Sequence, residues 1–210
     1  MSEPVAVAVL AKAPLAGFAK TRLIPVLGAQ GAALLQTRLI AHAVATACAA
    51  AVGPVTLWVT PDEHHPALQA IAAEDAIALK RQCDGDLGAR MLAALEAANG
   101  PTLVIGTDCP ALTLDHLRAA ADILRGGSDA VVIPADDGGY VLIGMRAAQP
   151  ALFSDMRWST PGVMAETRHR LERLAMSWRE PFTLWDVDVP ADLDRLRQTG
   201  LQHLIPAPDA

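Results

Sequence analysis

The sequence alternates between short apolar runs and longer segments whose apolar side chains have helical spacing. The apolar runs predict strands at residues 5–10, 55–60, 77–81, 102–105, 130–134, 141–145 and 182–185, and the longer segments predict helices at 28–51, 67–73, 87–98, 114–125, 162–174 and 191–197. Strands that alternate with helices form βαβ units, in which the strands run parallel and helices cover both faces of the sheet. The sequence therefore predicts a three-layer α/β/α sandwich with a mostly parallel mixed sheet.

Length and composition favour one domain. The chain has 210 residues, of which 52% are hydrophobic and 19% charged, and this is enough apolar surface for one sizeable core. We expect a single domain over residues 1–200. Residues 201–210 contain Pro206 and Pro208, and we expect them to form a loosely ordered tail.

Charge and cysteine usage restrict the compartment and the partners. A formal net charge of -6 argues against binding nucleic acid or an anionic membrane by bulk attraction. The three cysteines form no C-x-x-C pair, so neither a disulfide framework nor a zinc ribbon is expected; Cys109 is interpreted as a packed thiol. The first residues lack the basic region of a signal peptide. We therefore expect a cytoplasmic protein with no nucleic-acid or membrane partner, and we leave association into a homodimer open.

The loop after the first predicted strand is unusually basic for an acidic protein. Residues 11–23 contain Lys12, Lys20 and Arg22 together with Gly17. Ligands of open α/β sheets bind beyond the carboxyl ends of the strands, where lysine and arginine can hold phosphate and a glycine lets backbone amides approach it. The simpler alternative is a solvated basic loop. The glycine-rich fingerprints of dinucleotide sites and P-loops are absent from this segment.

Acidic residues follow two later strands. Asp108 comes after the strand at 102–105, and Asp186 and Asp188 come after the strand at 182–185. The last two share one face of an extended segment. Magnesium uses one or two carboxylates, with water and phosphate oxygens completing its shell. These positions therefore predict metal carboxylates, with turns or helix caps as the alternative for individual aspartates.

Further loops carry candidate ligand-binding residues. These are Asp86 and Gly88 at one helix start, Asp137, Gly138 and Tyr140 in a turn between strands, and Ser159 and Thr160 at another helix start. Free amides at a helix start suit a base, sugar or phosphate, and hydroxyl groups suit an acceptor. The alternatives are a cap by Asp86, a tight reversal around Gly138, and a cap by Thr160 with Pro161 at the first helical position.

Six motifs occur in order over nearly the whole chain. They are Lys12-x-Pro14-x-x-Gly17-x-x-Lys20-Thr21-Arg22-Leu23, Gly85-Asp86-Leu87-Gly88-x-Arg90-Met91, Thr107-Asp108-Cys109-Pro110, Asp137-Gly138-Gly139-Tyr140, Trp158-Ser159-Thr160 and Asp186-Val187-Asp188-Val189-Pro190. Together they resemble a bacterial family named for a domain of unknown function, or as radical-SAM/selenodomain-associated transferases. The resemblance implies a glycosyltransferase A (GT-A) fold.

The first and last of these motifs are distantly similar to phospholactate guanylyltransferase and to the molybdenum-cofactor guanylyltransferases. That similarity implies that Lys20 and Arg22 hold a triphosphate, and that Asp108 and Asp188 bind Mg²⁺ or Mn²⁺. Val189 stands where those relatives carry threonine.

The resemblance implies a metal-dependent transferase with a nucleotide-activated donor. Our leading hypothesis is nucleotidyl transfer from a nucleoside triphosphate to a small phosphorylated or hydroxyl acceptor. Lys20 and Asp108 would be catalytic, Asp108 and Asp188 would hold the metal, and the nucleotide would contact Lys12, Gly17, Arg22, Asp86 and Gly88. The acceptor would contact Asp137, Gly138, Tyr140, Ser159 and Thr160. One alternative is glycosyl transfer from a nucleotide sugar with Asp137 as base; another is a nucleotide-responsive binding module without turnover.

Overall fold

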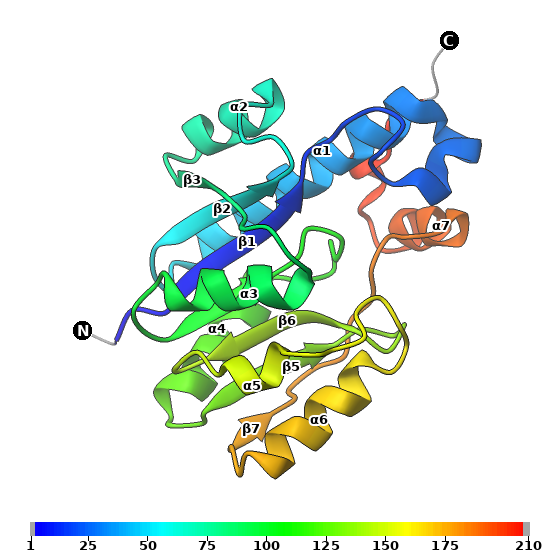
Figure 1. Cartoon of the computed structure of the whole chain (residues 1–210). Coiled ribbons are helices and arrows are strands. Elements are labelled where there is room, and N and C mark those ends of the chain that lie inside the picture. Colours follow the sequence, from blue (N-terminus) through cyan, green and yellow to red (C-terminus); the bar gives the residue numbers. More distant parts are fainter. Residues whose placement is uncertain (1–2, 208–210) are drawn as a thin grey trace.

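The computed structural model describes residues 3–207 as a three-layer sandwich around one sheet (Figure 1). The strands are β1 (Ala6–Lys12), β2 (Val55–Thr60), β3 (Ala78–Arg81), β4 (Thr102–Ile105), β5 (Ala130–Pro134), β6 (Tyr140–Met145) and β7 (Trp178–Arg179). Their order across the seven-stranded sheet is β3-β2-β1-β4-β6-β5-β7. Among these described strands, β6 alone runs antiparallel to its neighbours β4 and β5. The predicted mixed, mostly parallel sheet is confirmed.

The helices divide between the two faces of the sheet. One face is covered by α1 (Ile24–Ala50), α2 (Pro66–Glu74) and α4 (Leu114–Arg125), and the other by α3 (Leu87–Glu96), α5 (Pro150–Phe153) and α6 (Val163–Arg173). Alternate residues of β1 enter the two cores: Val7 and Val9 pack in the first and Ala8 in the second. Burial of both faces explains the continuous apolar runs that the strands show in sequence.

Helix α1 is long and apolar. By length and composition alone, the segment Thr21–Ala50 is long and apolar enough to cross a membrane. Its buried residues Ile40, Val44 and Ala47 pack in the same core as β1 and α4. Packing within the sandwich therefore accounts for its apolar character.

The predicted strand at residues 182–185 is wrong. The last strand, β7, lies at Trp178–Arg179 and pairs with β5. Residues 182–185 contribute a single bridge, between Leu184 and Ala135. Pro181 separates the two and has no N–H to donate, which interrupts the ladder.

The chain ends with α7 (Pro190–Gln198) and a short 3₁₀ helix, η2 (Gln202–Leu204). The loosely ordered tail expected from residue 201 is not what residues 201–207 form. Leu204 is buried in a small third core. The guanidinium of Arg38 on α1 donates to the carbonyls of His203 and Ile205 at 3.1 and 2.8 Å. Residues 208–210 lie outside the described part of the chain.

Candidate active site at the carboxyl edge of the sheet

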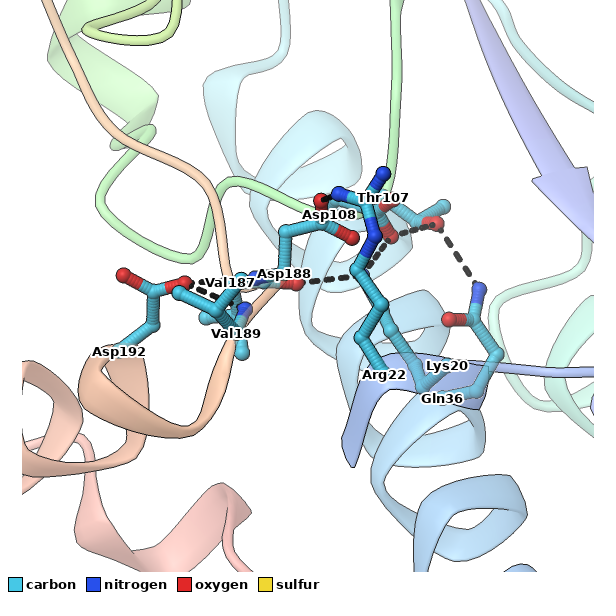
Figure 2. A network of polar contacts seen from close by, with 9 residues as sticks. All are labelled: Lys20, Arg22, Gln36, Thr107, Asp108, Val187, Asp188, Val189 and Asp192. Atoms are coloured by element: carbon cyan, nitrogen blue, oxygen red, sulfur yellow. Dashed lines mark hydrogen bonds and ion pairs between the residues drawn. The ribbon is translucent and has the colours of Figure 1, made fainter. Parts of the chain in front are cut away.

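Three segments that are distant in sequence meet where β1 and β4 end. The first is the loop between β1 and the 3₁₀ helix η1 (Thr21–Leu23), and the second is the loop after β4 that carries Asp108. The third precedes α7 and joins the second through a backbone hydrogen bond from Val187 N to Asp108 O of 2.7 Å. The predicted convergence of the basic loop with both acidic segments is therefore present in the structure (Figure 2).

Lys20 is the link between all three segments. Its side chain is only 4% exposed, and its Nζ lies 2.8 Å from Asp108 Oδ1. The same Nζ donates to the carbonyl oxygen of Val187 at 2.6 Å. Lys20 also has a left-handed backbone, with φ of 47°, a conformation that costs a non-glycine residue energy and is concentrated at functional sites. The ammonium group therefore connects the loop of Asp108 to the segment of Val187 and does not project into solvent.

Arg22 differs from Lys20 in exposure. Its guanidinium forms an ion pair with Asp188, and the two side chains are 68% and 55% exposed. Asp188 is held at the start of α7, where Asp192 Oδ2 accepts hydrogen bonds of 2.8 Å from the amides of Asp188 and Val189. Asp192 was not among the residues predicted from the sequence, although an aspartate three residues after a helix boundary is a recognisable capping signal. Arg22 is thus the more accessible of the two cations.

Asp186 concentrates negative charge behind these pairs. The pKa of Asp186 is raised to about 7, by burial foremost and then by the charges of Asp137 and Asp108, against the opposing effect of Lys20. Asp137 therefore belongs to the same acidic region, as the sequence pattern did not by itself establish. Asp108, Asp137, Asp186 and Asp188 thus outnumber the two cations, Lys20 and Arg22, in this region.

The donor set suits a divalent cation. Asp108 is 51% exposed and Asp188 is 55% exposed, so both can reach a ligand from solvent, and magnesium prefers oxygen donors of this kind. Within residues 3–207, no three His, Cys, Asp or Glu side chains are close enough together to form a metal site. Bound magnesium commonly takes only one or two carboxylates plus phosphate and water. Asp108 and Asp188 therefore fit a divalent cation whose other ligands are water or phosphate oxygens.

Asp86 and Gly88 have structural roles at the start of α3. Asp86 Oδ1 accepts a hydrogen bond from Ala89 N of 2.9 Å, so Asp86 caps the helix. A Cβ on Gly88 would lie 2.7 Å from the ring of Trp158, and glycine is therefore required for this close packing. The Tyr140 ring packs against Trp158, and its hydroxyl lies 3.8 Å from the Met91 sulfur; burial raises the Tyr140 pKa.

The turn between β5 and β6 packs on the loop before α6. A Cβ on Gly138 would lie 2.2 Å from Pro161 O, and Gly138 has a φ of +91°. Asp137 Oδ1 accepts a hydrogen bond from Gly139 N of 2.9 Å.

The predicted cap by Thr160 is wrong: α6 begins at Val163 without a side-chain cap, and the Thr160 hydroxyl donates to the Arg157 carbonyl at 2.9 Å. Gly162, not Thr160, occupies the capping position. Ser159 is exposed.

The remaining residues of the first loop are arranged around its own turn. Lys12 is exposed and donates to the carbonyl of Phe18 at 3.1 Å. Gly17 has a φ of +83°, which glycine adopts without strain. Cys109, next to Asp108, is buried, and burial raises its pKa to about 12. A packed thiol, as expected, accounts for Cys109.

A search of curated proteins found no match. Among solved structures, a protein from Desulfovibrio desulfuricans G20 that carries the assignment nucleotide-diphospho-sugar transferase has a TM-score of 0.85 and 27% identity over 95% of this chain and 88% of its own. A CMP:2-keto-3-deoxy-manno-octonic acid synthetase complexed with CTP has a TM-score of 0.59 and 12% identity over 96% and 100% of the two chains. Glucosyl-3-phosphoglycerate synthase from Mycobacterium tuberculosis, in complex with Mn²⁺, UDP and glucosyl-3-phosphoglycerate, has a TM-score of 0.54 and 11% identity over 99% and 81%.

The likeness to these structures establishes the fold as that of the nucleotide-diphospho-sugar transferases, which is GT-A-like. In sequence, residues 43–160 match the model of a family described as "Uncharacterized protein conserved in bacteria (DUF2064)". The matched range is more than half of the chain and includes Asp108 and Asp137, whereas Lys20, Arg22 and Asp188 lie outside it. The chain therefore belongs to the DUF2064 family and has a GT-A-like fold.

Proposed function

We propose that this protein is a divalent-metal-dependent nucleotidyltransferase that uses a nucleoside triphosphate and a small phosphorylated or hydroxyl acceptor. One observation carries this assignment: Lys20 and Arg22 meet Asp108 and Asp188 at the edge where β1 and β4 end. The GT-A-like fold supports it, because solved proteins with this fold hold CTP in one case and Mn²⁺ with UDP in another.

The reaction requires positioning and charge neutralisation more than covalent participation by the protein. An acceptor oxygen attacks the α-phosphorus, a new phosphorus–oxygen bond forms, and the bond from the α-phosphorus to the bridging oxygen breaks. Pyrophosphate leaves with that electron pair, and a hydroxyl acceptor gives up its proton to solvent water. Arg22 is exposed enough to contact the phosphates, while Lys20 holds Asp108 and Val187 in register.

The metal would be Mg²⁺ or Mn²⁺, and Asp108 and Asp188 would hold it. When bound there, a divalent cation neutralises phosphate oxygens as negative charge spreads over them.

Glycosyl transfer is the second candidate, because the Desulfovibrio protein assigned as a nucleotide-diphospho-sugar transferase is 27% identical over 95% of this chain. In that reaction the acceptor oxygen bonds to the anomeric carbon and a nucleoside diphosphate leaves. Asp137, whose charge reaches Asp186 in the same region, would accept the acceptor proton.

Two assays separate these functions. Thermal shift in Mg²⁺ or Mn²⁺ compares nucleoside triphosphates with nucleotide sugars, because a ligand that binds the folded state raises Tm. Release of pyrophosphate over a panel of small acceptors then identifies nucleotidyl transfer, and release of nucleoside diphosphate identifies glycosyl transfer.

Asp108→Ala tests the metal assignment. We expect it to abolish metal-dependent turnover in a folded protein, while Asp115→Ala, which removes an 84% exposed aspartate on α4, leaves turnover intact. Unchanged turnover in Asp108→Ala would refute the assignment.

A further inference from the structure

A buried polar pair lies directly behind Asp108. Gln36 on α1 is 4% exposed and Thr107 is 5% exposed. The Gln36 Nε2 donates to the Thr107 hydroxyl oxygen at 3.2 Å (Figure 2). Gln36 is flanked on α1 by the apolar core residues Leu35 and Leu39, so a polar side chain here is costly unless it is hydrogen-bonded.

The pair has a direction. Because the Thr107 oxygen already accepts from Gln36, its single hydrogen is free to donate onward. The next acceptor is Asp108 Oδ1, at 3.4 Å. The same Oδ1 receives the Lys20 ammonium at 2.8 Å. Among the described residues, no hydrogen bond or ion pair reaches the other oxygen, Oδ2.

From this arrangement we propose that Gln36 and Thr107 are positioning residues for the metal carboxylate, an inference that rests on the proposed function. The relay from Gln36 through Thr107, together with Lys20, occupies Oδ1 and fixes the rotation of the Asp108 carboxylate. Oδ2 then faces outward as the oxygen offered to a divalent cation. Groups that orient a metal-binding side chain in this way tune affinity without touching the metal.

The simpler explanation is that the two residues only satisfy each other's hydrogen-bonding groups inside the fold. Both explanations predict a loss of stability when the pair is removed. Only the positioning role predicts a change in the affinity for a metal ion. Binding of Mn²⁺ alone, measured by the electron paramagnetic resonance signal of the free ion, therefore separates them without relying on turnover.

The informative variant is Thr107→Val, which keeps the side-chain shape and removes the hydroxyl. We expect Mn²⁺ affinity to fall about tenfold, near the lower end of such effects. Thr107→Ser restores a hydroxyl and is expected to bind Mn²⁺ as the wild type does. Gln36→Met is expected to weaken binding less than Thr107→Val, because the Thr107 hydroxyl stays present but loses the donor that directs it.

Thr102→Val is the matched control. Thr102 is 1% exposed at the opposite end of β4, and its hydroxyl donates to the Gly100 carbonyl at 2.9 Å. This variant also loses a buried hydroxyl, so its Tm is expected to fall, but its Mn²⁺ affinity should equal that of the wild type. If Thr107→Val does not fold, the comparison of Gln36→Met with Thr107→Ser and the wild type gives the answer.

The outcomes separate this inference from the proposed function. Wild-type affinity in Thr107→Val and Gln36→Met, with a Tm loss like that of Thr102→Val, would overturn the positioning role and leave the metal site standing. If the wild-type protein does not bind Mn²⁺, or Asp108→Ala binds it equally well, the metal assignment fails and the inference fails with it.

Discussion

Lys20 and Arg22 are two residues apart in sequence, but they differ in burial and in the contacts that they make. Lys20 is almost fully buried and donates to oxygens of two other segments, Asp108 and Val187. Arg22 is mostly exposed and pairs with one carboxylate, Asp188. Removing a buried donor leaves its acceptors unsatisfied, whereas an exposed ion pair contributes little to stability. The resemblance to known transferases implied one role, phosphate binding, for both.

This difference predicts opposite phenotypes. Lys20→Met should lower the free energy of unfolding by about 1–3 kcal/mol. Arg22→Met should change it by less than about 1 kcal/mol, yet weaken binding of a nucleoside triphosphate more than any change in stability explains. Urea unfolding and calorimetric titration measure the two quantities. Equal stability losses in the two variants would contradict the assigned roles.

Among the elements, the segment before α7 is held in place by apolar side chains that alternate with aspartates. Trp185 and Val187 are buried in the third core with Leu23, next to Arg22. Asp186 and Asp188 alternate with them and belong to the acidic region. One short extended segment therefore ties the cationic loop to the carboxylates. The sequence predicted that the two aspartates share a face, but it placed a strand just before them.

A second link between elements joins α6 to the residues after β7. The Arg168 guanidinium donates to both oxygens of Glu180, at 2.9 and 2.6 Å, and Trp178 Nε1 donates to Glu180 at 3.0 Å. These hydrogen bonds, that of Arg168 foremost, hold the pKa of Glu180 below its ordinary value. A lowered pKa means that the ionised form is favoured by folding.

Glu180→Gln should therefore destabilise the protein by about 1 kcal/mol at neutral pH. The stabilisation by Glu180 is present above the ordinary glutamate pKa and is lost as pH falls through the lowered pKa of the folded state. Urea unfolding at neutral and at strongly acidic pH should show the difference between variant and wild type disappear in acid. A difference that persists in acid would mean that shape, not charge, carries the contact.

Across the whole molecule, the features that follow from periodic hydrophobicity were predictable from the sequence. The features that depend on packing between distant segments were not. Continuous apolar runs and helical spacing were enough for the layers and the mixed sheet. The basic loop and the acidic segments were predicted to meet because strand ends share one edge of a sheet. The pairing of Gln36 with Thr107 was missed, because only the fold brings these two residues together. The cap by Asp192 is a local contact that its position after the helix boundary could have indicated. The packing of residues 201–207 was missed because the prediction was based on Pro206 and Pro208. Nothing in the sequence marks Leu204 as a residue that tertiary packing buries.

We propose above that Asp108, Asp188 and Arg22 form one site for a divalent cation and the phosphates of a nucleotide. The most direct test is a crystal structure of the protein with Mn²⁺ and a non-hydrolysable nucleoside triphosphate, with manganese located by anomalous scattering. We predict a manganese peak in contact with Asp108 Oδ2 and Asp188, and phosphates beside Arg22. A manganese ion or triphosphate bound elsewhere on the molecule, with these carboxylates still paired to Lys20 and Arg22 alone, would refute this site.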